Sequence, residues 1–245
     1  MNKILMSSPE KTSIINDGKY RFSEDTTLTL EVEDFSKDIF LSVTSHKKVI
    51  FNLFSKNSTL NFHIQILKGA EFVFNYFSIN GSNTITTNLL EDESKFYLNY
   101  SVLNDDNSNN KITVYHDASK TEAYLKNHGF SSGGAKLVFD VSSYIPKEAS
   151  SCISRQDNQI LENSQSFSQI NPNLYIENYD VEASHSAYIG EFKEDELFYL
   201  MSRGLKIEEA KLLLLQAFLM GSLHIDDERR EKYQGEIKKY FIREV

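Results

Sequence analysis

His185 is the residue of this 245-residue chain whose type and setting best suit metal or proton chemistry. It lies in the stretch Asp180–Gly190, directly before the sequence changes from strand-like to helix-like character. An imidazole titrates near neutral pH and is a common metal ligand. The alternative interpretation is a hydrogen-bonded structural histidine, because a lone histidine by itself rarely marks a site.

Cys152 is the only cysteine, so no intramolecular disulfide forms. A thiolate binds iron well, but iron–sulfur clusters need about four ligands, most of them thiolates. The same residue type is also typical of small buried side chains. We therefore interpret Cys152 as structural and expect a reducing compartment, the cytoplasm.

Other chemistries find little support in the sequence. The run Ser132–Gly134 lacks the lysine of a phosphate-binding loop, and Asp105-Asp106 lacks the spaced oxygen ligands of a calcium loop. There is no Gly-x-Ser-x-Gly motif. The other histidines lack metal-ligand spacing and are interpreted as ordinary structure: His46, His63, His116, His128 and His224.

Strands must position these residues, because apolar and polar side chains alternate from about residue 26 to 189. A period of two is typical of β-strands. Turn clusters such as Asn80–Asn83 separate the runs every ten to twelve residues, which fits a sandwich, a barrel or a solenoid. The shortage of two-residue hairpin signals favours a solenoid. The alternating residues include Leu28, Leu30, Val32, Ile39, Leu41, Val43, Val49, Phe51, Leu53, Phe62, Ile64, Ile66, Phe72, Phe74, Tyr76, Phe96, Leu98, Tyr100, Ile112, Val114, Leu137, Phe139 and Val141.

Helical character begins after Gly190. Residues 194–203 start with acidic side chains and end with a basic one, and Gly204 fits a left-handed C-terminal cap. A second helix is predicted from Lys206 to Met220, with a wide apolar face and Gly221 closing it. A third is predicted over 226–241, with ion pairs Asp226/Arg230 and Glu228/Lys232.

Composition excludes several classes of function. The net charge of −9 disfavours nucleic acid and anionic membrane surfaces as partners. No segment approaches the roughly 20 apolar residues that cross a bilayer. The start, MNKILMSSPEKTS, lacks the hydrophobic stretch of a signal peptide, which also leads us to expect a cytoplasmic protein.

The last third of the chain resembles the C-terminal signature of the SufB/SufD family of iron–sulfur cluster assembly proteins. Several fixed spacings match together, and weaker matches lie upstream at Phe139, Ala149, Gln156, Asn158 and Leu161. SufB-type chains place a cysteine where Asn158 stands and a glutamate where Ser186 stands, so the resemblance is closer to SufD. The matching residues are Pro172-Asn173-Leu174, Asp180-Val181, Ala183-Ser184-His185, Gly190, Leu197–Gly204, Glu209-Ala210 and Ala217-Phe218.

The resemblance implies a right-handed parallel β-helix followed by a C-terminal α-helical domain. Together with the strand and helix patterns, it divides the chain into an N-terminal segment (1–25), a β-helix core (26–190) and a helical domain (191–245). Larger family members have a long N-terminal helical region, so we expect this chain to be short at that end.

The resemblance also implies a scaffold rather than an enzyme, acting in a SufB–SufC–SufD complex. The expected partners are a SufC-type ABC ATPase and a SufB-type chain or a second copy. No cofactor is expected to bind stably, and an iron–sulfur cluster would be held transiently, with His185 as a ligand. ATP-driven closure of SufC would pull on the helices and shift the β-helix interface. The residues expected to contact SufC are Leu197, Phe198, Leu200, Met201, Arg203, Gly204, Leu213, Leu214 and Phe218.

Two alternatives stay open at this stage. A β-solenoid enzyme acting on polysaccharide would need paired carboxylates in a groove lined with aromatic residues. A purely structural β-helix module would pair with itself through its strand edges.

Overall fold

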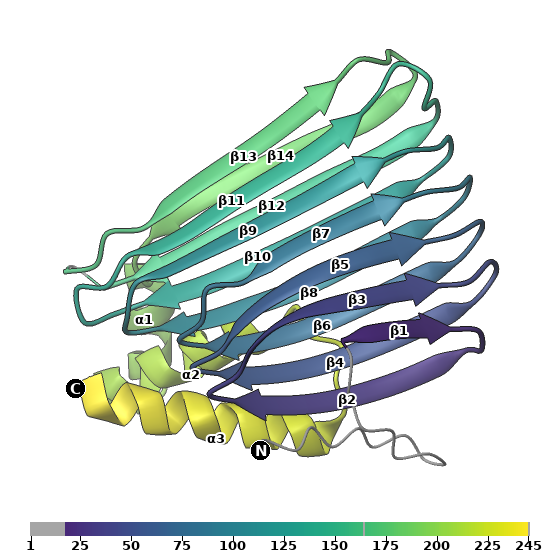
Figure 1. Cartoon of the computed structure of the whole chain (residues 1–245). Helices are drawn as coiled ribbons and strands as arrows, with labels where there is room; N and C mark the ends of the chain where they lie inside the picture. The colour runs from purple at the N-terminus through teal and green to yellow at the C-terminus, as the bar shows by residue number, and fades with distance from the viewer. Residues whose placement is uncertain (1–17, 164, 245) are drawn as a thin grey trace.

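A computed structural model, which describes residues 18–163 and 165–244, shows a β-solenoid followed by three helices (Figure 1). Within the described residues, the strands form two seven-stranded parallel sheets. Odd-numbered strands build one sheet and even-numbered strands the other, so the chain changes sheet after every strand. The prediction of a mainly β parallel β-helix with a C-terminal helical part is therefore confirmed.

The first sheet contains the odd-numbered strands. They are β1 (Lys19–Phe22), β3 (Ser36–Val43), β5 (Thr59–Ile66), β7 (Thr84–Leu89), β9 (Ser108–His116), β11 (Leu137–Ile145) and β13 (Gln169–Ile176). The second sheet contains β2 (Thr26–Glu33), β4 (Lys48–Lys56), β6 (Glu71–Ile79), β8 (Lys95–Asn104), β10 (Glu122–Ser131), β12 (Cys152–Glu162) and β14 (Val181–Gly190).

The solenoid core is built from columns of side chains that stack from turn to turn. Every alternating apolar residue on which the strand prediction rested is buried. Successive turns are offset by 23 residues at Asn52 and Asn75 but by 31 at Asn127 and Asn158. Because the turns lengthen along the chain, the repeat has no constant period in the sequence.

Helices α1 (Glu194–Ser202), α2 (Ile207–Met220) and α3 (Asp227–Glu244) lie close to their predicted positions. Gly204 follows α1 with φ of +97°, as its role in a left-handed cap requires. Gly221 closes α2 in right-handed helical geometry instead.

The predicted ion pairs of α3 are wrong. Asp226 pairs with Arg229, and Lys232 reaches Glu31 on β2. Arg230 instead donates to the carbonyl oxygens of Met220 and Leu223. Tertiary partners displace the local pairs because carbonyl oxygens at and just after the end of α2 lie within reach of Arg230.

The helices cover the outer face of the even-numbered sheet, near the C-terminal ends of its strands (Figure 1). A second apolar cluster forms there between the sheet and α2 and α3. It explains why these strands carry apolar residues on both faces. The sheet contributes Phe54, Phe77, Ile79, Leu103 and Phe130, and the helices contribute Leu215, Leu219, Met220, Tyr233, Ile237, Tyr240 and Phe241.

Of the expected domain limits, the structure describes the region around residues 25 and 190 but not the start of the N-terminal segment. Residues 1–17 of the expected N-terminal segment, which include the stretch discussed as a signal peptide, lie outside the described residues. Strand β1 begins within that segment and pairs with β3. The strands end at Gly190, and α1 starts at Glu194. Of the helices that the structure describes, none is long and apolar enough to span a membrane.

Candidate functional site at the open end of the solenoid

His185 stands at the end of an interior column of side chains. The column passes through one residue of every even-numbered strand, in the order Leu28, Phe51, Phe74, Leu98, Leu125, Gln156 and His185. Its first five members are buried and apolar, Gln156 is buried and polar, and His185 is exposed. The imidazole is exposed because β14 is the last strand of its sheet, and no further turn in the described part of the chain covers it.

The residues beside His185 are held by polar contacts to β12. Ser186 Oγ donates to Asp157 Oδ1 at 2.9 Å, and its carbonyl oxygen accepts from Asn158 Nδ2 at 3.1 Å. Burial opposes ionisation of Asp157, but hydrogen bonds from Gln159 and Ser186 and the nearby His128 together lower its pKa. The segment that carries His185 is thus fixed by a carboxylate that stays charged at neutral pH.

The open end also exposes apolar side chains on two unpaired strand edges. Within the described residues, β13 and β14 are the last strands of their sheets. Tyr175 and Ile176 on β13 and Tyr188 and Ile189 on β14 are between 38% and 50% exposed. Unpaired edges with exposed apolar residues readily accept another chain.

A column of tyrosines on the outer face of the odd-numbered sheet ends at the same place. Tyr115 stacks on Tyr144 with ring centroids 4.9 Å apart, and Tyr144 stacks on Tyr175 at 4.5 Å. Tyr175 is half exposed, with one ring face unstacked by any described residue. The column and the interior row of His185 both end where a further turn would continue them.

A second exposed surface lies on the helices, near the C-terminal ends of the even-numbered strands (Figure 1). Helix α1 buries none of its residues, and Phe198 on it is 75% exposed. Acidic residues fill the first turns of α1 and α2. We call this surface the helical patch; it consists of Phe198, Tyr199, Met201, Ile207 and Leu213.

Two grooves adjoin the helical patch. One, of about 510 Å³, lies between the solenoid and α1 and α2, with Phe192, Leu197 and Ile207 among its lining residues. The other, of about 620 Å³, lies between α2 and α3 and includes Leu212 and Leu213. The patch therefore combines exposed apolar side chains with hollows next to them.

The residues expected to bind the ATPase differ in their exposure to solvent. Phe198, Met201, Arg203, Gly204 and Leu213 are exposed, while Leu197, Leu200 and Leu214 are half-buried. Arg203 lies over the ring of Tyr199, 5.3 Å from its centroid. Phe218 is turned toward β10, where its ring stacks on His128. The first group is accessible to a partner, and Phe218 makes an internal contact.

His185 is the residue for which the sequence predicts a metal-ligand role, and no described cluster of ligand residues surrounds it. The structure holds no group of three or more histidine, cysteine or acidic residues, among those it describes, that could bind a metal. Cys152 is buried, with Thr121 Oγ1 lying 3.3 Å from its Sγ. A single exposed imidazole supplies one of the roughly four ligands that a cluster needs, so the others would have to come from another chain.

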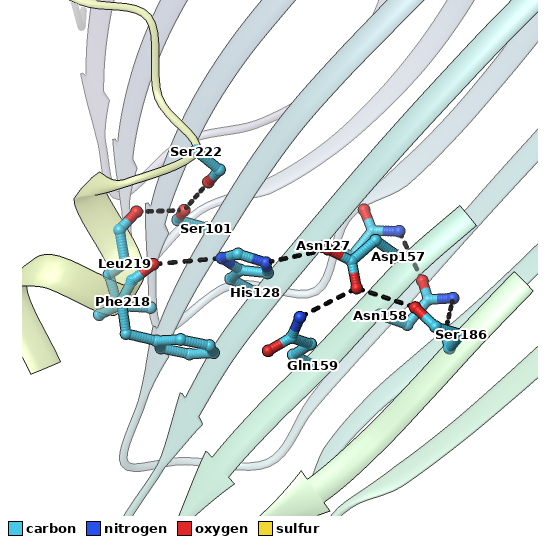
Figure 2. Close-up of polar contacts among 10 residues, drawn as sticks. All are labelled: Ser101, Asn127, His128, Asp157, Asn158, Gln159, Ser186, Phe218, Leu219 and Ser222. Atoms are coloured by element: carbon cyan, nitrogen blue, oxygen red, sulfur yellow. Dashed lines mark hydrogen bonds and ion pairs between the residues drawn. The ribbon is translucent and has the colours of Figure 1, made fainter. Parts of the chain in front are cut away.

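Sequence reasoning missed one functional candidate, His128. It lies on the outer face of β10 between α2 and β12, where it contacts both (Figure 2). No local motif marks it, because its partners Phe218 and Asp157 are distant in sequence. Only the strand register and the docking of α2 bring the three residues together.

Comparison with known proteins agrees with the geometry. The model of the family described as "SUF system FeS cluster assembly, SufBD core domain" matches residues 40–218. The iron–sulfur cluster assembly protein SufD of Bacillus subtilis is 34% identical over 107 residues, which cover 43% of this chain and 24% of that protein. A SufBD family protein of Pyrococcus horikoshii is 55% identical over 40 residues, or 16% of this chain and 9% of that protein.

These matches cover a quarter or less of each relative's length, so they describe only a part of those proteins. The family match, by contrast, spans most of this chain, from within β3 through the rest of the solenoid and α1 into the last turn of α2. This chain therefore belongs to the SufB/SufD family of iron–sulfur cluster assembly proteins and is SufD-like.

Proposed function

We propose that this chain is a scaffold subunit of a SufBCD-type complex. Its open end pairs with a SufB-type chain or a second copy, and its helical patch docks a SufC-type ABC ATPase. The observation that carries the proposal is the position of His185, exposed at the end of an interior column between two unpaired strand edges. A partner solenoid stacked on this end would enclose the imidazole and add the missing ligands.

The cluster is the cargo of this scaffold and is held only between chains. His185 supplies one nitrogen ligand, and Asp157 and Asn158 hold its strand through Ser186. The family match favours this role over the glycan-processing alternative, although glutamates line the groove beside α1. A self-paired structural module would use the same open end without any need for His185.

Replacing His185 with alanine is expected to lower cluster build-up on the purified three-protein complex at least about tenfold, because one ligand of the shared site is lost. Build-up is followed by the visible absorbance of the cluster and by iron content. Ser184→Ala, on the same exposed strand, is the matched control and should leave the yield unchanged. An unchanged yield for His185→Ala would remove His185 from the ligand set.

The docking surface is tested by placing charge on it. Phe198→Asp and Leu213→Asp should each weaken binding of the SufC-type ATPase at least about tenfold, since both side chains are exposed apolar anchors on the helices. The measurement is isothermal titration calorimetry with the purified ATPase. Tyr179→Asp, fully exposed in the turn between β13 and β14, is the control. Equal affinity of all three variants would place the ATPase elsewhere.

A further inference from the structure

The C-terminal end of α2 is fastened to the even-numbered sheet by side chains of other elements. The last carbonyl groups of a helix have no partner within the helix and must find donors elsewhere. Ser101 Oγ, on β8, donates to the carbonyl oxygen of Leu219 at 2.6 Å. His128 Nδ1, on β10, lies 3.1 Å from the carbonyl oxygen of Phe218 (Figure 2).

His128 holds this helix end in two ways at once. A carbonyl oxygen only accepts, so Nδ1 carries the proton and donates it to Phe218. The imidazole also stacks on the Phe218 ring, with centroids 4.7 Å apart and planes 9° from parallel. The ring is mostly shielded from water, with 14% of its side-chain surface exposed. Its position therefore depends on that of α2.

The other side of the same imidazole faces β12. Nε2 lies 3.7 Å from Asp157 Oδ2, an ion pair when the ring is protonated. The second oxygen of Asp157 accepts the hydroxyl of Ser186, the residue after His185. Figure 2 shows these contacts running in one line, from α2 across β10 and β12 to β14.

A parallel row of amides runs beside this line on the inner faces of the two strands, where Asn127 precedes His128 and Asn158 follows Asp157. Asn127 Nδ2 donates to Asn158 Oδ1 at 2.8 Å, and Asn158 Nδ2 donates to the carbonyl oxygen of Ser186. Both rows end on Ser186, one at its side chain and one at its backbone. The strand that carries His185 is thus held at one residue by groups that trace back to β10.

We propose that His128 is a positioning residue that couples α2 to the edge strand β14, so that a displacement of the helix loosens or tightens the segment around His185. The proposal deepens the proposed function and rests on it, because it supplies the route by which a protein bound to the helical patch acts on the open end of the solenoid. It rests on contacts within the chain and is testable without any partner.

Phe218→Ala tests the coupling, since it removes the ring on which His128 stacks. Amides of β14 are expected to exchange roughly three- to tenfold faster with deuterium, because opening of the strand costs less once the bridge loosens. The measurement is hydrogen exchange with mass spectrometry on the purified full chain. Leu214→Ala, on the same helix and also half-buried, is the control and should affect only amides of the helices. Unchanged exchange in β14 of Phe218→Ala would overturn the proposal.

A second variant separates coupling from mere support of the helix. In a His128→Leu background, Phe218→Ala should produce no further change in β14, whereas independent effects would add. His128→Asn keeps an amide donor near Phe218 but no longer reaches Asp157, so it should leave α2 protected and β14 loosened. Loosening of α2 and β14 together in His128→Asn, with additive effects in the double variant, would reduce His128 to a structural residue. Failure of ATPase docking would leave these results untouched, so the two proposals fail separately.

Discussion

Replacing Phe74 with alanine is expected to lower the free energy of unfolding by about 3–5 kcal/mol, the usual range for a fully buried phenylalanine. Phe74 lies in the middle of the column that ends at His185 and is completely buried. Its ring stacks on Phe51 with centroids 5.2 Å apart and on Tyr76 at 5.3 Å, and meets the edge of Phe62 at 5.1 Å. With Phe72 as a fourth ring contact, removing Phe74 leaves a cavity lined by four aromatic neighbours, and rigid rings fill such space poorly.

Urea unfolding followed by circular dichroism measures this cost. Phe40→Ala is the control, because Phe40 lies on the outer face, is 40% exposed and stacks on His63 alone among the described aromatic residues. That change should cost no more than about 1 kcal/mol. A similar cost for both variants would mean that the interior columns are not close-packed and that the solenoid does not hold His185 on a rigid base.

The strands were predictable because each inner face must be apolar. Leu28, Phe51 and Phe74 indicate the inner face of their own strands, since every second residue of a strand faces the interior. Which strand pairs with which was not predictable in the same way. The pairing is set by corner turns of varying length, so the spacing of 23 residues near Asn75 grows to 31 near Asn158.

The packing of the helices on the even-numbered sheet is also visible in the sequence, as apolar residues at outward-facing strand positions. Phe54 and Phe77 are apolar but out of phase with the inner positions of their strands. They face α2 and α3, and both rings contact Tyr233. The helical faces were also harder to assign, because α2 is apolar on two sides: Leu215 and Leu219 pack on the sheet, while Leu213 faces solvent.

The residues of the candidate site also differ in whether a local sequence pattern marks them. His185 was singled out from a motif that is continuous in sequence, and the structure places it at the exposed end of an interior column. His128 was set aside as an ordinary histidine, since its significance comes from Phe218, which is 90 residues away. Residues that act through distant contacts leave no local pattern to read.

Acid is expected to destabilise the corner beneath β14, by which we mean the contacts of His116 at the end of β9 with Thr121 and, through it, Cys152. Burial lowers the pKa of His116 from 6.5 to about 4. Its Nδ1 lies 2.7 Å from Thr121 Oγ1, which contacts Cys152, and Cys152 pairs in register with Val181 at the start of β14. Protonation of this ring would therefore disturb the support of the strand that carries His185.

Stability falls as the pH falls, because the unfolded state binds the proton at a higher pH than the native state does. The native ring stays neutral until pH falls to about 4, whereas the unfolded ring takes up a proton near pH 6.5. The stabilisation is complete above the unfolded pKa and is lost as pH falls below it, by about 1.4 kcal/mol per pH unit. Between pH 7.5 and 4.5, His116 should therefore remove roughly 2–3 kcal/mol of unfolding free energy.

Urea unfolding of wild type and His116→Phe at these two pH values isolates this contribution, because every other titrating group is common to both proteins. Phenylalanine fills a similar volume and does not titrate, so the variant should lose roughly 2–3 kcal/mol less than wild type on acidification. The two pH values lie on either side of the sequence pI of about 5.2, which keeps both samples charged. Equal losses in the two proteins would show that His116 is free to protonate in the folded state, and that the corner beneath β14 is open to water.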